Sequence, residues 1–422
     1  MTDKKKSVYI CIDLKSFYAS VECVCRGLDP MTTNLVVADP ERKSGTVCLA
    51  ITPAMKQLGV KNRCRVFEIP PGIEYIMAPP RMKLYIEYSA RIYGIYLRYF
   101  DKNDIHVYSI DEVFIEATNY MKLYGDDPVK LAKDIKDQIY REVGIRATAG
   151  IGTNMYLAKV GMDILAKHRE DGIAILNEES YQRELWDHVP ITDFWRIGRG
   201  TARRLEKYGI YNMGQLAHAN ENLIRKVFGI DGELLIDHAW GRETATLDDI
   251  KKYRPKDHSL SSGQVLFADY TTKKAKLVLM EMTQLLALDL VKKKLMTDSI
   301  SLYIGYSHKL PLPPTGGASR LPFYTNSSQI ICQHMAGLYE QVVLEEMPVR
   351  RLNISFNNVT GEGDEQLNFF ASPEELSRER DMMRAINDVH DKYGKNAMLT
   401  AMDFEEGATT RERNNQIGGH KK

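Results

Sequence analysis

A chain of 422 residues exceeds what one hydrophobic core usually organises, so the sequence predicts two to four domains. Its 57 basic and 56 acidic residues nearly cancel, and a hydrophobic content of 44% is ordinary for a globular protein. No stretch approaches the roughly 18 apolar residues of a membrane span, and the apolar run near the N-terminus is too short for a signal peptide. We therefore expect a cytoplasmic protein that does not enter a membrane.

The first predicted element is a buried strand, "SVYICID", followed by a helix that begins near Ser16. Asp13 therefore lies at the carboxyl end of a buried strand. Proline and glycine punctuate residues 30–80, which predicts a small separate lobe. A long amphipathic helix should then run from about Arg81 to Phe100.

The stretch "VYSIDEVFIEAT", residues 107–118, has the composition of a buried strand but carries Asp111 and Glu112 side by side. Two like charges about 4 Å apart repel by roughly 4 kcal/mol at an effective dielectric constant near 20, so the pair requires a nearby cation. Neighbouring residues of a straight strand point to opposite faces. Both carboxylates can therefore reach one ion only if a turn or bulge bends the chain between them.

A sheet that brings Asp13 alongside this pair would gather three carboxylates at one edge, an oxygen-rich setting that suits Mg²⁺. Two such ions about 4 Å apart can clamp the attacking and leaving oxygens of a phosphoryl transfer. If the acidic pair is considered alone, the alternative to a metal site is that Asp111 and Glu112 face solvent on an edge strand.

A helix near residues 128–143 and a strand within "IRATAGIGTN" complete the order strand, helix, strand, strand, helix, strand. That order predicts a ferredoxin-like sheet, interrupted by the proline-rich lobe. Residues 177–245 are predicted to be helical, and residues 253–360 to form a second, small α+β domain. In that domain we expect helices at 272–295 and near 328–346, and a strand, "RLNISFNNV", whose apolar residues alternate.

Charge is distributed unevenly along the C-terminal part of the chain. Residues 251–360 hold 14 Lys and Arg against 8 Asp and Glu, a net charge of +6, whereas residues 361–422 hold 9 against 13, a net charge of −4. A basic module followed by an acidic tail indicates a polyanionic ligand for the first and a protein partner for the second.

Two motifs carry a family resemblance. "IDLKSFYASVE" (12–22) together with "YSIDEVFIEA" (108–117) resembles the palm of the Y-family, translesion DNA polymerases. The similarity is closest to the branch of the catalytic subunit of bacterial DNA polymerase V and its Gram-positive relatives, and it covers nearly the whole chain. It implies an α+β multidomain chain with a ferredoxin-like palm, small fingers, a helix-hairpin-helix thumb and a C-terminal α+β little finger.

The implied domain boundaries follow the predicted elements. They are 1–19 and 81–176 for the palm, 20–80 for the fingers, 177–245 for the thumb, 253–360 for the little finger and 361–422 for an acidic C-terminal tail.

The resemblance implies that Asp13, Asp111 and Glu112 are the catalytic carboxylates that bind two Mg²⁺ ions, with the backbone carbonyl of Leu14 as a further metal ligand. Phe17 and Tyr18 match the family's aromatic pair in the nucleotide site. Tyr18 falls on the steric gate, a rigid ring that excludes the 2′-hydroxyl of ribonucleotides. On the segment "GIGTNMYLAKVGMDILAKH", Lys159 falls on a lysine that contacts the triphosphate.

The fingers depart from the family pattern. Polymerase IV type sequences have a Tyr, and an Arg three residues later, that hold the triphosphate, but here Thr52 and Met55 stand in those places. Lys15 also replaces a common Asp or Asn. Lys56 and Arg42 are substitutes by proximity only, so the way in which the triphosphate is held stays open.

The segment "PITDFWRIGRGTARRL" (190–205) resembles the thumb hairpin of the family. Ile197, Gly198 and Gly200 would bind DNA there, because a glycine-bearing hairpin exposes backbone N–H groups to phosphates. Arg196 stands where glycine is usual, so the hairpin is expected to be tighter or shifted.

A short apolar peptide follows the basic domain. "QLNFF" is similar to the peptide by which bacterial polymerases dock on the sliding clamp. The corresponding clamp-binding residues are Gln366, Leu367, Asn368, Phe369 and Phe370.

These expectations describe a monomeric, distributive, template-directed translesion DNA polymerase. Its partners would be primer-template DNA, deoxynucleoside triphosphates and the bacterial sliding clamp. Two alternatives stay open: a catalytically weak DNA-binding and clamp-docking scaffold, motivated by Thr52 and Met55, and a nucleotidyl cyclase, which uses a similar palm with paired carboxylates.

Overall fold

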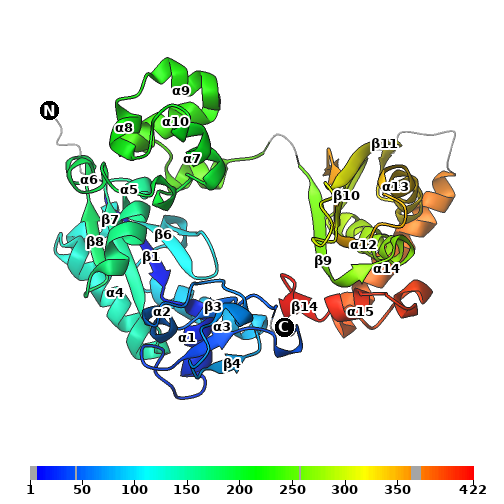
Figure 1. Cartoon of the computed structure of the whole chain (residues 1–422), viewed down its shortest axis with the longest axis horizontal. Helices are drawn as coiled ribbons and strands as arrows, with labels where there is room; N and C mark the ends of the chain where they lie inside the picture. Colours follow the sequence, from blue (N-terminus) through cyan, green and yellow to red (C-terminus); the bar gives the residue numbers. More distant parts are fainter. Residues whose placement is uncertain (1–6, 43–44, 256–257, 363–371) are drawn as a thin grey trace. The chain divides into compact units, whose positions relative to one another are not determined.

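The computed structural model of the chain describes residues 7–42, 45–255, 258–362 and 372–422. The chain divides into two compact units, Met1–Tyr253 and Arg254–Lys422 (Figure 1). Among the described residues, no helix is long and apolar enough to cross a membrane.

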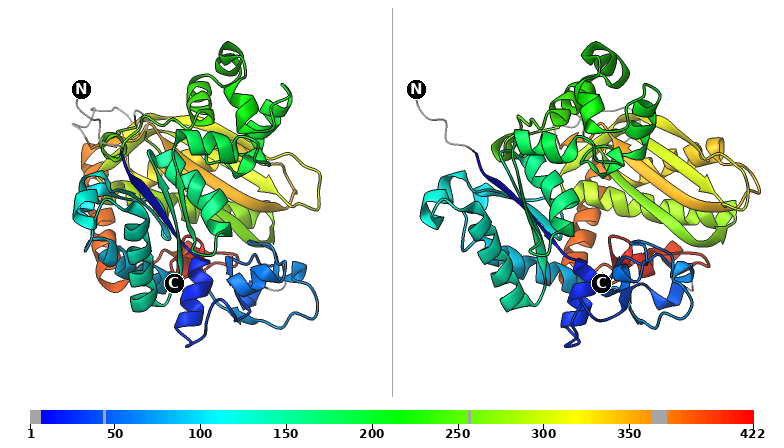
Figure 2. Two further views of the ribbon diagram at one scale, coloured as in Figure 1. Left: turned by 90° about the vertical axis from the view of Figure 1, so that its left-hand side faces the viewer. Right: turned by 60° about the vertical axis from the view of Figure 1, so that its left-hand side comes forward.

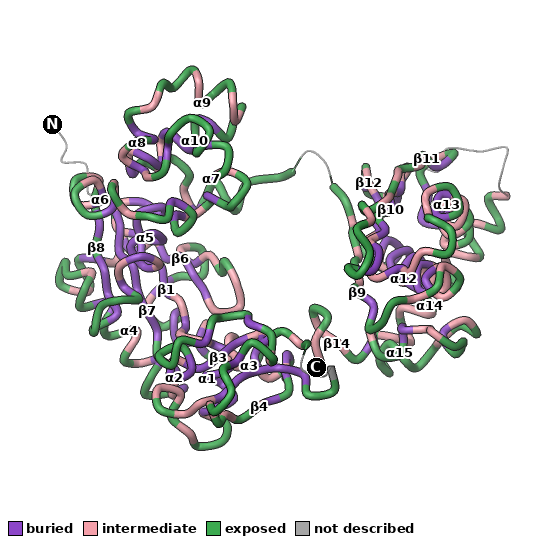
Figure 3. Tube along the Cα trace, in the orientation of Figure 1, coloured by how far each residue is buried: buried purple, intermediate pink, exposed green. Residues whose placement is uncertain are grey.

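The first unit is built around a five-stranded sheet with the order β5-β6-β1-β7-β8. The central strand β1 pairs antiparallel with both β6 and β7, so it is hydrogen-bonded on both sides. Its apolar residues make β1 buried along nearly its whole length, as Figure 3 shows. The strands are β1 (Tyr9–Leu14), β5 (Ile105–Val107), β6 (Glu112–Glu116), β7 (Ala147–Gly152) and β8 (Ile173–Leu176).

Helices cover both faces of this sheet (Figure 2). One face carries α3 (Met82–Tyr96) and α4 (Pro128–Val143), both close to their predicted positions. Asp127 is the N-cap residue of α4, and its side chain accepts hydrogen bonds from the N–H groups of the first turn. Gly144 is the C-cap residue and adopts the left-handed conformation. The other face carries a continuous helical segment made of α5 (Met155–Val160), a π-helical turn η5 (Gly161–Leu165) and a 3₁₀ turn η6 (Ala166–His168).

A three-stranded sheet, β3-β2-β4, lies in the region rich in proline and glycine. It has a small hydrophobic core of its own, to which Met55 and Cys48 contribute. Its elements, with the helix that precedes it, are α1 (Phe17–Val24), β2 (Leu35–Val37), β3 (Ala50–Ile51), α2 (Pro53–Gln57) and β4 (Ile76–Ala78).

A cluster of short helices follows β8, as predicted for residues 177–245. Tyr156 and Leu157 of α5 belong to the same hydrophobic core as Phe194 and Leu205 of these helices, so the cluster packs on the sheet through α5. The helices are α6 (Glu178–Leu185), α7 (Arg199–Glu206), α8 (Met213–Ala217), α9 (Glu221–Phe228), α10 (Ile230–Ala239) and α11 (Leu247–Lys252).

The second unit is a four-stranded antiparallel sheet, β11-β10-β12-β9, with two helices on one face. The predicted alternation in β12 is confirmed, because Leu352, Ile354 and Phe356 are buried in the core. The elements are β9 (Leu260–Tyr270), α12 (Thr272–Lys292), β10 (Leu295–Tyr306), β11 (Thr315–Thr325), α13 (Ser328–Val342), β12 (Val349–Asn357) and β13 (Thr360–Gly361).

Residues 372–422, part of the segment expected as an acidic tail, form helices and strands that were not predicted. Helix α14 (Pro373–Tyr393) buries Met383 in the core of the second unit and donates from the Asn387 amide to the carbonyl of Leu288 in α12. Near the end of the chain, the buried carboxylate of Glu281 accepts hydrogen bonds from the backbone N–H groups that open α15 (Thr410–Arg413). Two short strands, β14 (Gln416–Ile417) and β15 (His420–Lys421), close the chain. The C-terminal segment therefore belongs to the second folded unit.

Candidate active site

The predicted bend beside the acidic pair is a tight hairpin turn. Strand β5 ends at Val107 and β6 begins at Glu112, so the apolar run is two strands. The backbone N–H groups of Tyr108 and Ser109 both donate to the carbonyl of Glu112, at 3.0 and 3.1 Å. As a result Asp111 projects from the turn, while Glu112 keeps its place in the sheet.

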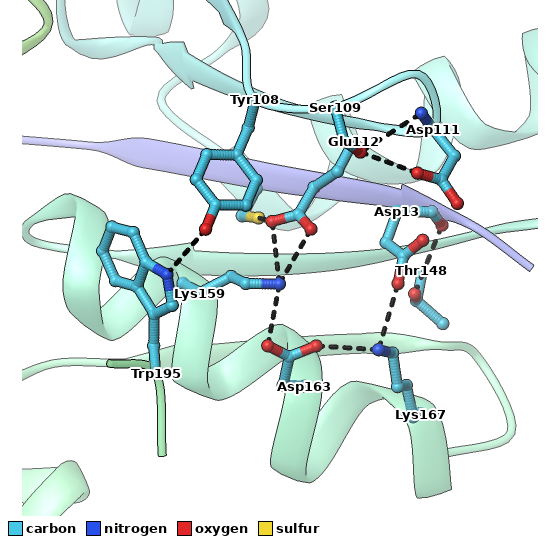
Figure 4. A network of polar contacts seen from close by, with 11 residues as sticks. Asp13, Tyr108, Ser109, Asp111, Glu112, Thr148, Lys159, Asp163, Lys167 and Trp195 are labelled. Atoms are coloured by element: carbon cyan, nitrogen blue, oxygen red, sulfur yellow. Dashed lines mark hydrogen bonds and ion pairs between the residues drawn. The ribbon is translucent and has the colours of Figure 1, made fainter. Parts of the chain in front are cut away.

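The sheet brings Asp13 next to this turn, as the sequence analysis anticipated. Asp13 and Glu112 are directly opposite each other on β1 and β6. The backbone N–H of Leu14 donates to the carbonyl of Asp111 at 3.0 Å. Three carboxylates, from residues separated by about a hundred positions, therefore lie at one edge of the sheet (Figure 4).

Hydroxyl groups orient two parts of this edge. The Ser109 hydroxyl donates to Oδ1 of Asp111 at 2.7 Å, which fixes the carboxylate in the turn. The Thr148 hydroxyl on β7 donates to the backbone carbonyl of Asp13 at 3.3 Å.

Lysines on the helical segment α5–η5–η6 pair with two of the three carboxylates, Glu112 and Asp13. Nζ of Lys159 lies 2.8 and 2.9 Å from the two carboxylate oxygens of Glu112, and 2.8 Å from Asp163. Nζ of Lys167 lies 3.0 Å from Asp13 and 2.7 Å from Asp163. Lysine, aspartate and lysine thus follow one another at intervals of four residues on the face that meets the carboxylates (Figure 4).

Two glycines on β7 allow this helical segment to come so close. A Cβ atom on Gly150 would lie 2.0 Å from the backbone oxygen of Ala158, and one on Gly152 would lie 2.4 Å from its nitrogen. No other residue fits at these positions without displacing the helix, because real Cβ contacts are never so short. The glycines therefore set the distance between Lys159 and Glu112.

Burial makes the carboxylates weaker acids than usual. It raises the pKa of Glu112 and of Asp13, and the neighbouring lysines oppose that rise only in part. Burial acts against the charge of Lys159, yet the surrounding Cys11, Asp163 and Glu112 raise its pKa above the ordinary value. The lysine therefore stays charged beside Glu112.

The donor atoms fit a hard divalent cation. Three carboxylates and the Leu14 carbonyl are oxygen ligands of the kind that Mg²⁺ prefers. In the part of the chain that the structure describes, no three acidic, His or Cys side chains are gathered around one point. Both oxygens of Glu112 face Lys159 instead.

The predicted steric gate is held by a stack of aromatic rings. Phe17 is buried, whereas Tyr18 is half-buried and stacks on Tyr85 with ring centroids 4.5 Å apart at 16°. The Tyr85 hydroxyl donates to Glu22 at 2.7 Å, and Glu22 is paired with the Arg81 guanidinium at 2.7 Å. Burial, and then the charge of Asp111, raise the pKa of the Tyr18 phenol, so this ring lies near the turn.

The turn between β1 and α1 has the features of an anion site. Ser16 adopts a left-handed conformation with φ of 50°, no side chain caps α1, and the buried Ser16 hydroxyl has no hydrogen-bond partner among the described residues. Burial lowers the pKa of Lys56, and the positive charges of Lys167 and Lys15 lower it further. Together with the ion pair between Lys167 and Asp13, these groups gather positive charge near the turn.

Neither Thr52 nor Met55, the two residues of the fingers that depart from the family pattern, places its side chain in this site. Thr52 is fully buried, and its hydroxyl accepts from the backbone N–H groups of Leu35 and Met55 as the cap of α2. Met55 packs in the small core beneath the three-stranded sheet. The side chain of Arg42 lies outside the described part of the chain.

Lys167 is the site residue that sequence reasoning missed. The structure places it at Asp13, with its side chain 40% exposed, whereas the side chain of the predicted Lys159 is 8% exposed and fully engaged by two carboxylates. The spacing of four residues from Asp163 was the available signal, but that spacing is common on solvated helices.

The predicted DNA-binding hairpin leads into α7. Ile197 is buried, Gly198 is the N-cap residue of α7, and a Cβ on Gly198 or Gly200 would meet nothing within 4 Å. Arg196 has φ of 70°, the left-handed conformation that glycine would adopt there at no cost. The backbone at Arg196 thus adopts the left-handed conformation that is usual for glycine, although the residue is an arginine.

Comparisons with known proteins agree with this geometry. The models of the impB/mucB/samB family and of its C-terminal domain match residues 12–163 and 257–369. A Bacillus subtilis protein named for UV-damage repair, UvrX, is 33% identical over 417 residues, which cover 98% of this chain and 97% of that protein. DNA polymerase IV 2 of Bacillus subtilis is 31% identical over 99% of this chain and 100% of its own length.

A solved structure, a Y-family DNA polymerase chimera of Dbh and Dpo4, matches with a TM-score of 0.66 at 22% identity, over 84% of this chain and 99% of that chain. The fold is therefore that of a Y-family DNA polymerase, and the predicted α+β multidomain class is confirmed. The chain belongs to the impB/mucB/samB family, the DNA polymerases of the translesion type.

Proposed function

We propose that this polymerase adds deoxynucleotides to a primer 3′-hydroxyl opposite damaged template bases, with low processivity and low fidelity, by two-metal phosphoryl transfer. The observation that carries the proposal is the edge where Asp13 faces Glu112 and the turn presents Asp111, beside an uncapped helix N-terminus. Acidic and basic groups are thus adjacent, as a metal–triphosphate substrate requires.

Asp13, Asp111, Glu112 and the Leu14 carbonyl would hold two Mg²⁺ ions. Such ions would supply the positive charge that activates the attacking hydroxyl and offsets the charge of the departing pyrophosphate. Lys159 favours the ionised form of Glu112, because it holds a positive charge against both carboxylate oxygens. The Ser109 hydroxyl keeps Asp111 directed out of the turn.

The triphosphate would lie between the N-terminus of α1 and the lysines around Asp13. Backbone N–H groups, the unpartnered Ser16 hydroxyl and the charges of Lys15, Lys56 and Lys167 all favour an anion here. These groups would replace the Tyr and Arg that the fingers lack. The family resemblance assigns Lys159 to the triphosphate. Here Lys159 would instead act indirectly, by pairing with the carboxylate of Glu112.

Tyr18 would close the sugar side of the nucleotide site, with Phe17 packed behind it. A ring fixed by Tyr85 from below cannot move aside for a 2′-hydroxyl, so ribonucleotides would be excluded by overlap.

Primer-template DNA would be held without sequence preference by the thumb hairpin at Ile197, Gly198 and Gly200 and by the second unit. The sheet of that unit leaves one face uncovered, where a shallow hollow of about 420 Å³ is lined by Ser, Asn, Tyr303 and Arg351 side chains. Residues 254–360 of that unit hold 12 Lys and Arg against 8 Asp and Glu, and this net charge of +4 suits a phosphate backbone.

The proposed clamp peptide, residues 366–370, lies outside the described residues. The proposal that it docks on a sliding clamp rests on the family resemblance and on its sequence. We further propose a monomeric catalytic chain that works on DNA in the cytoplasm.

The decisive experiment is primer extension with purified wild-type chain and Asp111→Asn. Losing one metal ligand should slow nucleotide addition by more than about a thousandfold. Primer-template binding should stay nearly unchanged, because the grip resides in the thumb and the second unit. Near-normal extension by Asp111→Asn would refute the metal assignment.

The two alternative functions give different results. A DNA-binding scaffold would bind primer-template without extending it, even as wild type. A nucleotidyl cyclase would convert a nucleoside triphosphate in the absence of DNA, which product analysis after incubation without primer-template detects.

A further inference from the structure

We propose that Trp195 and Tyr108 form a positioning contact that couples the thumb hairpin to the Asp111–Glu112 turn. The inference rests on the proposed polymerase function and adds two residues that align the catalytic turn without touching substrate. Figure 4 shows both side chains beside the network of carboxylates and lysines.

The contact joins two parts of the first unit that are distant in sequence. The indole Nε1–H of Trp195 donates to the Tyr108 hydroxyl at 3.1 Å, and the two rings meet edge to face with centroids 5.9 Å apart at 81°. Phe114 of β6 completes the cluster, 5.6 Å from each of the two rings. The interaction is therefore directional as well as apolar.

On one side, Tyr108 contacts both the turn that carries Glu112 and the lysine that pairs with it. Its backbone N–H helps to close the turn by donating to the Glu112 carbonyl, and its ring lies 5.9 Å from Nζ of Lys159. Lys159 in turn holds both carboxylate oxygens of Glu112. A displacement of Tyr108 would therefore move the turn and remove the contact between its ring and Lys159, the counter-ion of Glu112.

On the other side, Trp195 is fixed by the thumb hairpin. Arg196, the next residue, holds the left-handed backbone conformation, and its guanidinium lies 5.3 Å from the Trp195 ring. His238 of α10 lies parallel to the indole, with centroids 6.4 Å apart, and is paired with Glu243 at 2.9 Å. Gly198, where α7 begins, is only three residues away.

The position of Tyr108 shows why the contact matters. The residue is 46% exposed, so its own turn does not immobilise its ring. Trp195 supplies the missing constraint from an element that would itself be seated on DNA phosphates. Because small misplacements of catalytic groups cost large factors in rate, a hairpin correctly seated on DNA would align the turn.

The test compares Tyr108→Phe, Trp195→Phe and the double variant. Tyr108→Phe keeps the ring and removes only the acceptor. We expect kcat to fall about three- to tenfold, the range that one hydrogen bond supplies, with the Kd for primer-template and the Tm unchanged. If the two residues act through one contact, the double variant should be no slower than Trp195→Phe alone.

A matched control is Trp186→Phe. Trp186 lies in the same helical cluster, and its indole N–H donates to the Ala239 carbonyl at 2.8 Å, away from the turn. This variant should lower Tm but leave kcat unchanged at temperatures well below melting. The control therefore distinguishes the general effect of losing an indole hydrogen bond from the specific effect of losing the bond between Trp195 and Tyr108.

A readout that needs no catalysis is the fluorescence of Trp195. The chain has three tryptophans, so Trp186→Phe with Trp240→Phe leaves Trp195 as the reporter. Adding primer-template should change its emission, and adding Tyr108→Phe should alter that response. If Trp195→Phe, or the reporter background, melts early, Tyr108→Phe in the otherwise native chain decides through kcat.

An unchanged kcat in Tyr108→Phe, or effects of the two single variants that multiply in the double variant, would overturn the coupling. If wild-type chain itself fails to extend a primer, the proposed function fails instead, so the two failures are distinguishable.

Discussion

At the scale of single residues, the two lysines of the site have different surroundings although each faces a carboxylate. Lys159 is almost fully buried between Glu112 and Asp163, whereas Lys167 reaches Asp13 from an exposed rim. Breaking a buried ion pair is costly because it leaves an uncompensated charge, but an exposed ammonium can exchange a carboxylate for a phosphate. The two residues should therefore respond differently to removal.

Lys167→Ala should raise KM for the incoming nucleotide about tenfold or more, the effect of a lost charge-assisted hydrogen bond, with little change in Tm. Lys159→Ala should instead lower stability by about 3–5 kcal/mol, because the carboxylate of Glu112 would be buried without a counter-ion. Steady-state primer extension and thermal melting measure both. A Lys159→Ala variant with normal Tm and only a raised KM would favour direct contact between Lys159 and the triphosphate.

Tyr18→Ala should increase ribonucleotide incorporation relative to deoxyribonucleotide, because the ring that occupies the 2′ position is removed. Tyr18→Phe keeps the ring on Tyr85 and should retain discrimination. Competition assays with matched ribo- and deoxynucleotides give the ratio. Unchanged discrimination in a folded Tyr18→Ala chain would show that Tyr18 only packs the core.

The carboxylates could be predicted from the sequence, because an acidic pair within an apolar strand breaks the strand pattern and calls for a bend and a cation. The identity of that cation could not. A lysine four residues from an aspartate is the ordinary pattern of a solvated helix, and the approach of Lys167 to Asp13 exists only after the sheet has formed. The contact between Trp195 and Tyr108 was hidden for the same reason.

At the scale of elements, the site depends on how closely one helical segment lies on one strand. Gly150 and Gly152 let α5 rest directly on the β7 backbone, which places Lys159 beneath Glu112. Most element positions followed from periodicity, as for α4, whose buried residues recur every third or fourth position. Helix α14 was missed because Met383 is its only fully buried residue, too little to form an apolar stripe.

Gly150→Ala should abolish extension and lower stability by about 3 kcal/mol or more, because the added methyl group would displace the α5 backbone. Gly94→Ala is the matched control: Gly94 lies within α3, with nothing within 4 Å of its Cβ position. That change should leave activity intact and stabilise the chain slightly. Melting curves and extension rates for the pair test the prediction, and a normally stable, active Gly150→Ala would contradict it.

Across the two units, the proposed catalytic residues are separate from part of the proposed DNA-binding surface. The carboxylate edge and the thumb hairpin lie in the first unit, and the sheet with an uncovered face is in the second. The change in charge near residue 361 lies inside the second unit, but a chain of several domains could be predicted from the alternation of element types. The integration of the C-terminal segment could not, since it depends on Glu281 and Thr410, which are far apart in sequence.

Replacing Leu367, Phe369 and Phe370 with Ala should leave unassisted primer extension unchanged and eliminate its stimulation by a loaded sliding clamp. Each apolar side chain buried in a partner groove contributes roughly 1.5–3 kcal/mol, so losing three should abolish docking. Phe404→Ala, an exposed phenylalanine of the same unit, is the control and should keep the stimulation. A lower Tm, or clamp stimulation as in wild type, would show that the peptide has another role.

The folding of the C-terminal segment onto the second unit also sets the length of any tether. The backbone N–H of Glu362 donates to the carbonyl of Lys294, and Ser372 is the N-cap residue of α14, so the described residues on either side of 363–371 both belong to the second unit. The ten peptide steps between these residues extend no more than about 35 Å. If a clamp bound this stretch, the second unit would be linked to the clamp by two short chain segments, one on each side of the peptide.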